Sequence, residues 1–293
     1  MLLCPQCRAA LSDTQDCASC HWQGETNGRV RVMLSAADRD SALFKGYQGN
    51  YDRIAADDLA SEILDLRYVG HQAANLVSVL GRRLRGARVC EVGVGQGYLA
   101  RAMLKAGAAS VTAVDIALPY LETLDHDRLV PVLANAENLP FQDEFDILTA
   151  TDVAEHVLNL GSFLYCANKA LRPSGLLVLR VPLVESLLKY SPFLGCRYRF
   201  VHLRSFSEDI IHRELPEAGF DIETFRRDGF WLSTPQPFWM AGARRRQIYQ
   251  RFKDHFSRTL ASPVDVTRWP AWIAALWMRP QELVVRARKV KEL

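Results

Sequence analysis

Four cysteines near the start of the chain have the spacing of a metal site. Cys4-Pro-Gln-Cys7 and Cys17-Ala-Ser-Cys20 are two C-x-x-C pairs, and each pair can form a tight turn that points two thiolates at one ion. Four thiolates suit the tetrahedral coordination of structural Zn²⁺ and leave no open position for catalysis. A redox pair or buried thiols are the alternatives, but two pairs this close together favour zinc. We therefore expect a small zinc-binding module over residues 1–34.

A glycine-rich segment has the residues of a nucleotide site. Val89–Val92 is a short apolar strand that contains the acid Glu91, and Gly93, Gly95 and Gly97 follow it. Glycine lacks a Cβ and tolerates positive φ, so such a loop lets the backbone approach a ligand closely. A helical pattern comes next, and the N-terminus of a helix favours anionic groups. Three glycines alone fit dinucleotide enzymes equally well.

Further strand ends carry polar side chains. Ser110–Asp115 has the pattern of a strand that ends in an acid, whose carboxylate can accept both hydroxyls of a ribose. Val130–Phe141 has the pattern of a strand and a turn, with Asn135 and Ala136 between them, and Thr151 follows another strand. In a doubly wound sheet such ends meet at one edge, where ligands bind. We therefore expect these residues to lie near one another at the edge of the sheet where a ligand would bind.

The motifs resemble those of one enzyme family in their order. They are E-V-G-V-G-Q-G at 91–97, N-A-E-N-L-P-F at 135–141, T-D-V-A-E-H-V at 151–157, L-R-P-S-G-L-L at 171–177 and H-L-R-S-F-S at 202–207. Together they resemble the class I S-adenosylmethionine-dependent methyltransferases, in particular those of quinone biosynthesis, over residues 85 to 290. The cysteine module resembles the zinc ribbons that are fused to bacterial methyltransferases.

This resemblance implies that S-adenosylmethionine is the cofactor. Glu91 would brace the glycine loop and face the methionine ammonium group, and Asp115 would bind the ribose. The family usually places an acid against the adenine amine, whereas this chain has Asn135, whose carbonyl can still accept from that amine. Ala136 and Thr151 complete the expected cofactor site, beside the three glycines.

Three residues are candidates for the chemistry at the acceptor. Asp152 and His156 follow a strand at the ligand-binding edge, and His202 precedes a later helix. Either histidine could remove a proton from the acceptor or orient it, with Asp152 near the sulfonium. A structural histidine that bonds to a loop is the alternative for His156.

These motifs require an α/β fold, and we predict a doubly wound, Rossmann-like, seven-stranded sheet over residues 85–293 with a small N-terminal zinc ribbon. Residues 35–84 would supply a linker, over Ser35–Arg53, and a cap of two helices, over Ile54–Leu84. A helical insertion over residues 228–280 would separate the last two strands, because a plain hairpin needs a far shorter connection.

Charge and hydropathy indicate in which part of the cell the protein is located. The chain has 293 residues and a net charge of +3, which is too small to indicate nucleic acid by itself. Residues 226–293 are nevertheless basic, with 14 Lys and Arg against five Asp and Glu. The chain has neither an apolar run of about 18 residues nor the features of a signal peptide. We therefore expect a cytoplasmic protein without a transmembrane segment.

The predicted insertion leaves three interpretations open. It contains Trp269, Trp272, Trp277 and the run Arg244–Arg246. Aromatic and basic side chains suit a lid over an anionic substrate, and they also suit peripheral contact with a membrane. Ordinary packing is the third interpretation, since tryptophan is usually buried.

Three functions remain open at this point. The first is methyl transfer to a small molecule or to a glycan, such as a lipid-linked sugar. The second is methylation of RNA, in which the zinc ribbon and the basic C-terminal segment bind the backbone. The segment Thr151–Ala154 replaces an N-P-P-Y-type motif, which disfavours methylation of a base amine. The third is a non-catalytic protein that keeps the cofactor fold.

Overall fold

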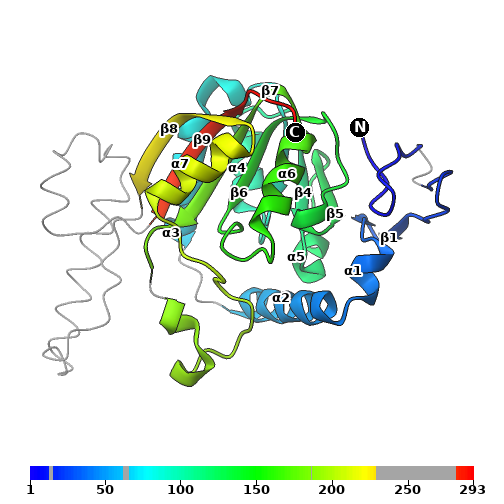
Figure 1. The fold of residues 1–293 in the computed structure, drawn as a ribbon, viewed down its shortest axis with the longest axis horizontal. Coiled ribbons are helices and arrows are strands. Elements are labelled where there is room, and N and C mark those ends of the chain that lie inside the picture. Colours follow the sequence, from blue (N-terminus) through cyan, green and yellow to red (C-terminus); the bar gives the residue numbers. More distant parts are fainter. Residues whose placement is uncertain (13–15, 62–65, 186, 229–281) are drawn as a thin grey trace, which may run out of the picture.

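The computed structural model describes residues 1–12, 16–61, 66–185, 187–228 and 282–293 (Figure 1). These residues build one sheet with helices on both faces. The insertion predicted over residues 228–280 lies outside the described residues apart from its first position, and so do its tryptophans and arginines.

The strands lie in the order β1-β2-β5-β4-β3-β6-β7-β9-β8. Strands β5, β4, β3, β6 and β7 are parallel, and β9 is antiparallel to both β7 and β8. The chain places β4 and β5 on one side of β3 and then β6 on the other, which makes the switch point where doubly wound sheets bind ligands. The strands are β1 Glu25–Asn27, β2 Val30–Val32, β3 Arg88–Val92, β4 Ser110–Asp115, β5 Leu129–Leu133, β6 Phe145–Thr151, β7 Leu171–Pro182, β8 Phe220–Asp228 and β9 Glu282–Lys289.

The prediction of seven strands was wrong, because two strands of the cysteine module join the main sheet. Strand β2 pairs in parallel with β5, so that Arg31 lies opposite Val132 and Val32 opposite Leu133. Strand β1 then pairs with β2 in the antiparallel sense. The edge of a sheet presents unpaired N–H and C=O groups. The backbone of β2 pairs with these groups on β5. The other seven strands are the predicted ones.

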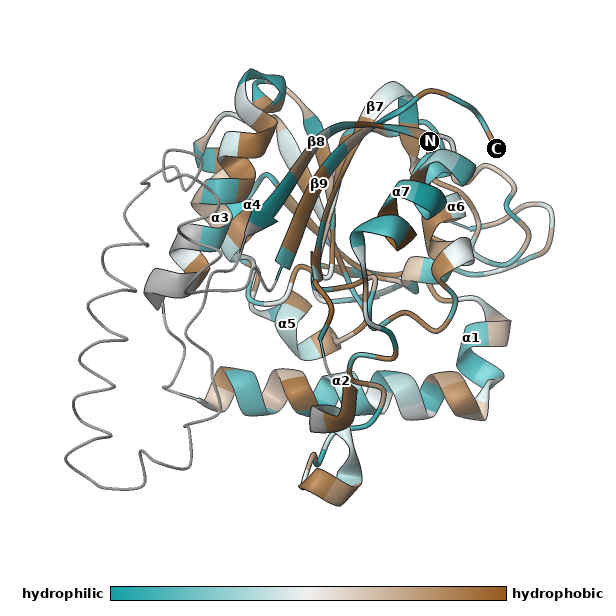
Figure 2. Ribbon diagram, turned by 60° about the vertical axis from the view of Figure 1, so that its left-hand side comes forward, coloured by the Kyte–Doolittle hydropathy of each residue, from teal (hydrophilic) through white to brown (hydrophobic). Residues whose placement is uncertain are grey.

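Helices cover both faces of the sheet because its buried strands are apolar on both sides. Val89 of β3 packs on the side of α4, whereas Cys90 and Val92 pack on the side of α6. Figure 2 shows that β9 is largely apolar while β8, at the edge, is more hydrophilic. The helices are α1 Ala36–Asp40, α2 Ala42–Ala60, α3 Leu66–Leu80, α4 Tyr98–Lys105, α5 Leu118–Glu122, α6 Leu160–Ala170 and α7 Glu208–Glu217, with short 3₁₀ turns at Gly81–Leu84, Ala136–Asn138, Leu187–Tyr190 and Pro192–Leu194.

The linker predicted at 35–53 is helical. Ser35 caps α1 and forms a reciprocal capping box with Asp38, and Ser41 caps α2 by accepting from the N–H of Phe44. These caps start two helices within a polar stretch whose composition is typical of a loop. Helices α2 and α3 are the two that were expected before the sheet, but α2 begins at Ala42, well before Ile54.

Helix α2 lies along the carboxyl edge of the sheet (Figure 1). The amide of Gln48 donates to the carbonyl of Ile116 at 3.4 Å, and the N–H of Leu118 donates to Asp52 at 3.1 Å. The helix therefore covers the ends of the strands that carry the predicted cofactor residues, as a helical cap should.

The segment Thr151–His156, at the end of β6 and after it, does not begin a helix. It forms turns, and α6 begins only at Leu160, where Asn159 accepts from the N–H of Ser162. Asp152 has a φ of 55°, which an α-helix does not allow. The turns hold the two predicted catalytic residues of this segment at the carboxyl edge.

At the C-terminal end of the described sheet, Ser207 caps α7 by accepting from the N–H of Ile210, and β9 covers Glu282–Lys289. Among the described residues no helix is both long and apolar enough to cross a bilayer.

Candidate functional site

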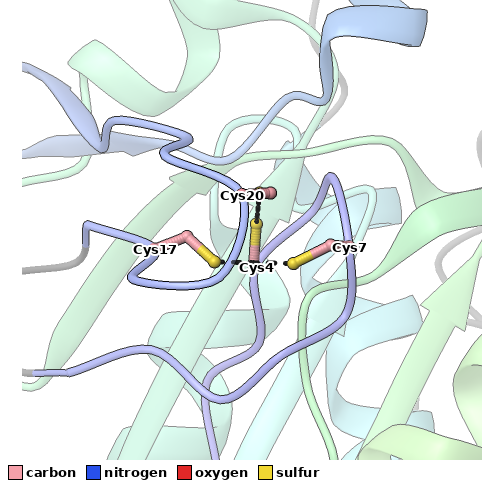
Figure 3. Close-up of side chains that lie close together, drawn as sticks. All are labelled: Cys4, Cys7, Cys17 and Cys20. Carbon is pink, nitrogen blue, oxygen red and sulfur yellow. Dashed lines mark hydrogen bonds between the residues drawn. The ribbon is translucent and has the colours of Figure 1, made fainter.

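The four cysteines of the N-terminal module converge (Figure 3). The sulfurs of Cys4 and Cys20 are 3.6 Å apart, those of Cys7 and Cys17 are 3.4 Å apart, and all four lie within 4.8 Å of one another. A tetrahedral zinc with Zn–S bonds of about 2.3 Å separates its ligand sulfurs by about 3.8 Å. The donor set and its spacing therefore fit a structural zinc ion.

Each cysteine pair sits in the same kind of turn. The N–H of Arg8 donates to the carbonyl of Cys4 at 3.0 Å, and that of His21 donates to the carbonyl of Cys17 at 2.9 Å. Arg8 and His21, which follow the second cysteine of each pair, have φ values of 67° and 60°. This left-handed position closes each turn so that both thiols face inward. His21 is not among the four residues whose ligand atoms converge.

The first knuckle, Cys4–Arg8, is bonded to the turn that follows β5. Arg8 donates to the Asn138 side chain at 3.0 Å, and Asn138 donates to the carbonyl of Pro5 at 3.0 Å. The N–H of Leu3 donates to the carbonyl of Pro140 at 2.8 Å. The module is therefore fixed to the main domain next to one of the predicted cofactor segments.

The glycine loop lies between β3 and α4. Gly93, Gly95 and Gly97 have φ values of 73°, 50° and 74°, a region that favours glycine. A Cβ on Gly93 would lie 2.3 Å from a methyl of Val153, and one on Gly97 would lie 2.6 Å from Leu124. A Cβ on Gly95 would meet nothing within 4 Å. The middle glycine therefore borders open space, where a ligand can approach the backbone.

Glu91 is buried below this loop at 2% exposure. Its Oε2 has no hydrogen-bond partner among the described residues. Burial raises the pKa of the Glu91 carboxyl well above its usual value, and the nearby Asp115 raises it further. An unpaired buried carboxyl oxygen is costly, and the positively charged methionine end of S-adenosylmethionine would supply its missing partner. The residue thus fits the cofactor that the motifs imply.

Asp115, at the end of β4, is tied to the same loop. One carboxylate oxygen accepts from the N–H of Gly95 at 3.0 Å and the other from the N–H of Ala117 at 2.9 Å. Burial raises the pKa of this carboxyl. Each oxygen keeps a second lone pair, so the side chain can hold the loop and still accept from ribose hydroxyls.

The remaining predicted cofactor residues flank these two acids. Asn135 donates to Asp38 of α1 at 2.8 Å, and its carbonyl accepts from the N–H of Glu137 at 2.9 Å. Ala136 lies in the 3₁₀ turn that Asn135 caps. Thr151 ends β6, and its carbonyl oxygen lies 4.0 Å from where a Cβ on Gly93 would be. All of them are at the carboxyl edge.

The two predicted histidines meet across this edge. The rings of His156 and His202 have centroids 4.7 Å apart and an angle of 82° between their planes. The hydroxyl of Tyr51, in α2, lies 2.8 Å from Nδ1 of His156 and donates to the Phe200 carbonyl at 2.9 Å. Burial, followed by the charge of His202, lowers the pKa of His156 to about 4. His156 is therefore neutral at pH 7.

His202 has a different environment. Its Nδ1 bonds to one carboxylate oxygen of Glu185, and the Tyr190 hydroxyl donates to the other oxygen at 3.0 Å. Tyr190 also stacks on the imidazole of His202. A carboxylate at Nδ1 holds a proton on that nitrogen, so Nε2 is the nitrogen that can exchange a proton with a ligand. Of the two histidines, His202 is the one whose Nδ1 is held by a carboxylate.

Asp152 does not bond to either histidine. It pairs with Arg180, whose Nε lies 3.3 Å from Asp152 Oδ1 and whose side chain is 7% exposed. Nearby, Glu155 is fully buried, and both of its carboxylate oxygens lack hydrogen-bond partners among the described residues. Burial raises the pKa of Glu155 well above its usual value. Ligand atoms of Glu155, His156 and His202 lie within 4.8 Å of one another, close enough to share a metal ion.

Three residues of this site were not predicted from the sequence. Glu185 and Tyr190 support His202, and Glu155 lies beside His156. The contact of Tyr51 with His156 was not predicted either. Glu155 lies within the motif T-D-V-A-E-H-V, next to His156. This position could have indicated that Glu155 belongs to the site. Tyr51 is 105 residues from His156 in the chain, so no local pattern connects the two.

Known proteins resemble part of this sequence and have a similar fold. The family described as "Methyltransferase domain" matches residues 66–224. The ubiquinone biosynthesis O-methyltransferase of Neisseria meningitidis serogroup C is 31% identical over 105 residues, which cover 32% of this chain and 43% of the relative. The mitochondrial protein of that name from Schizosaccharomyces pombe is 34% identical over 103 residues, 32% of this chain and 37% of the relative. The chain thus spans less than half the length of these curated relatives.

Solved structures agree on the fold. A chain of the Haloferax volcanii complex between the Trm112 methyltransferase activator and a methyltransferase has a TM-score of 0.58 at 15% identity, over 82% of this chain and 98% of that one. The 1,6-didemethyltoxoflavin-N1-methyltransferase of Burkholderia thailandensis, with S-adenosylhomocysteine bound, has a TM-score of 0.53 at 19% identity, over 86% and 91% of the two chains. With the family match covering more than half of its residues, the chain belongs to this family of methyltransferase domains and has the fold of the class I S-adenosylmethionine-dependent enzymes.

Proposed function

We propose that this protein transfers a methyl group from S-adenosylmethionine to a hydroxyl oxygen of a small acceptor, and that it holds a structural zinc ion at Cys4, Cys7, Cys17 and Cys20. The observation that carries the proposal is the carboxylate-bound His202 at the carboxyl edge of the sheet, beside the glycine loop. Val153 joins the two parts of the site, since it packs against Gly93 and its carbonyl accepts from the N–H of His156.

Some residues of the site would bind the cofactor, and others would act on the acceptor. S-adenosylmethionine supplies an electrophilic methyl group on a sulfonium. Glu91 and Asp115 would hold its methionine and ribose parts, and Asn135 would face its adenine. Holding the acceptor oxygen in line with the methyl group supplies most of the rate enhancement that such a reaction needs from a protein. Helix α2, through Tyr51, helps to cover the site.

His202 would take the proton of the acceptor hydroxyl at its Nε2. Glu185 holds Nδ1 and stabilises the positive charge that the ring gains as the proton arrives. His156, which is neutral because burial lowers its pKa to about 4, would orient the acceptor by a hydrogen bond. Asp152, paired with Arg180, would contribute to the shape of the edge and a local negative charge.

Exposed apolar side chains in the chain segment that contains Glu185 and Tyr190 favour an acceptor with an apolar part. Val184, Leu188, Phe193 and Leu194 are 72%, 72%, 94% and 60% exposed, and they flank Glu185 in the chain. Two of the relatives are O-methyltransferases of ubiquinone biosynthesis by name. Both observations support a hydroxylated small molecule with a hydrocarbon portion, and a lipid-linked acceptor is one such molecule.

RNA is less well supported as an acceptor. The described arginines of the basic C-terminal segment largely have acidic partners. Arg227 bonds to Glu208, and both Arg286 and Arg288 form ion pairs with Glu223, at N–O distances of 3.2 Å and 3.1 Å. Pairing with carboxylates leaves these side chains less available to phosphates.

Two measurements test the proposal. Calorimetric titration of the zinc-replete protein should show binding of S-adenosylhomocysteine and none of NAD. Methyl transfer from S-adenosylmethionine to an alkyl-substituted catechol should then be followed in the wild type and in His202→Gln. General base catalysis is worth a factor of about 10² or more, so His202→Gln should lose that factor in kcat with unchanged affinity for S-adenosylhomocysteine.

His212→Gln is the matched control, because His212 is an exposed histidine on α7 that stacks on Phe225. Turnover of His202→Gln at the level of His212→Gln would reject His202 as the base. Binding of NAD without S-adenosylhomocysteine would reject the cofactor and the reaction together.

A further inference from the structure

The first cysteine knuckle, Cys4–Arg8, contacts both the turn at 135–138 and the start of α1. On one side Asn138 bonds to Arg8 and to the carbonyl of Pro5, each at 3.0 Å. On the other side Gln6 accepts from the N–H of Ala36 at 2.8 Å, which is the first residue of α1. The knuckle is thus bonded both to the turn and to the start of the neighbouring helix.

Helix α1 in turn contacts the turn at 135–138 through the charged side chain of Asp38. Asp38 forms the capping box of α1 with Ser35, and its second carboxylate oxygen accepts from the Asn135 amide at 2.8 Å. The carbonyl of Asn135 accepts from the N–H of Glu137. Both ends of the Asn135 side chain are therefore fixed, so its carbonyl has one orientation.

We infer that the zinc knuckle positions the adenine end of the cofactor site, and that Asp38 and Arg8 are the positioning residues through which the knuckle fixes the orientation of the Asn135 side chain. The inference rests on the proposed function, because it takes S-adenosylmethionine as the cofactor and zinc as the ion. It assigns the ribbon a role in cofactor affinity and in the choice of base, in addition to stabilising the fold. A flexible ribbon would leave Asn135 free to rotate and to offer its NH₂ group where adenine needs an acceptor.

The test compares two ligands that differ only in the base. S-adenosylhomocysteine has a 6-amino group, whereas S-inosylhomocysteine has a 6-oxo group, which accepts hydrogen bonds and does not donate from that position. A fixed Asn135 carbonyl should make the wild-type protein prefer the adenine ligand. Asp38→Ala and Asn138→Ala in the full-length, zinc-replete protein should weaken binding of S-adenosylhomocysteine about tenfold, since each removes one or two hydrogen bonds that hold the turn. They should also reduce the ratio between the two dissociation constants.

This ratio separates positioning from general loss of structure, because partial unfolding weakens both ligands equally. Asp38→Asn keeps an acceptor oxygen for the Asn135 amide and should restore much of the ratio. Arg29→Ala is the matched control, since Arg29 joins the ribbon to Asp125 and to the carbonyl of His126, away from the turn. Arg8→Ala provides a second variant at the ribbon surface if Asp38→Ala does not fold.

Removal of zinc by a chelator should reduce the ratio in the wild type as the variants do. Unchanged affinity and an unchanged ratio in Asp38→Ala, Arg8→Ala and Asn138→Ala would overturn the inference and leave the proposed function intact. A wild-type protein that binds neither ligand would instead reject the proposed function, so the two failures are distinguishable.

Discussion

Tyr190 lies flat against His202, with ring centroids 4.1 Å apart and an angle of 18° between the ring planes. Its hydroxyl donates to the same Glu185 carboxylate that holds the imidazole. One side chain therefore fixes both the ring and its carboxylate partner. Removal of the hydroxyl and removal of the ring should have separable effects.

We expect Tyr190→Phe to lower kcat by about threefold to tenfold, because Glu185 loses one hydrogen bond while the stacked ring stays. Tyr190→Ala should lower kcat further, because His202 then also loses the surface that holds its plane. Steady-state kinetics with saturating S-adenosylmethionine measure both effects. Equal rates for Tyr190→Ala and the wild type would show that the stack does not position the base.

His156 gives the stability of the protein a defined dependence on pH. Burial lowers the pKa of this imidazole from 6.5 to about 4, so the unfolded chain binds its proton more readily than the folded chain. The contribution is complete above pH 6.5 and is lost as the pH falls towards 4. We expect the free energy of unfolding of the wild type to fall across this window by about 2–3 kcal/mol more than that of His156→Gln.

Urea unfolding of both proteins at pH 7.5, 6 and 5 measures this difference. The comparison between the two proteins matters, because the buried carboxyls Glu91 and Glu155 have raised pKa values and act on stability in the opposite direction. Parallel curves for the two proteins would contradict the assignment of a buried, neutral His156.

The glycines of the loop should respond differently to the same substitution. Gly93→Ala places a Cβ 2.3 Å from a methyl of Val153 at a φ of +73°, and it should destabilise the fold by about 2–4 kcal/mol. Gly95→Ala meets no protein atom within 4 Å, so it should cost about 1–2 kcal/mol of strain. It should nevertheless weaken binding of S-adenosylhomocysteine, because the ligand would occupy that space. Thermal melting and calorimetry separate the two effects, and tight binding by Gly95→Ala would place the ligand elsewhere.

The cysteine cluster should contain one zinc ion per chain. Cys4→Ser and Cys17→Ser should lose the metal and lower the melting temperature by about 5–10 °C, because each buried cysteine supplies one of the four converging sulfurs. Cys196→Ser is the control, since Cys196 lies outside the cluster. Elemental analysis of the purified variants checks the metal content. Zinc retained in Cys4→Ser, or absent from the wild type, would argue against the site.

The sequence predicted this site best where its residues are close in the chain. The glycine loop, Glu91 and the strand ending in Asp115 form one compact unit. Their residue types and spacing were sufficient to predict that they lie together at the carboxyl edge of the sheet. The partners of the histidines were not predictable in this way. Tyr51 reaches His156 only because α2 lies along the sheet edge, and Glu185 reaches His202 because the chain returns to that edge after β7.

The N-terminal region shows the same limit. The apolar pattern around Val30–Val32 favours a strand, but its pairing with β5 could not be predicted, because that edge forms only in the folded domain. The caps at Ser35 and Ser41 were readable in principle, but the polar composition around them resembled that of a linker. Capping outweighed composition there.

The pairing of β2 with β5 also sets an order of events during protein synthesis. Residues 1–20 are synthesised before β5 and can bind zinc at once, because both knuckles are local. The docking surface of the ribbon, at β5 and Phe141, does not exist until more than a hundred further residues have been added. The zinc ribbon can therefore fold before its partner strand is synthesised. The supply of zinc early in synthesis should govern how efficiently the nascent chain completes its sheet.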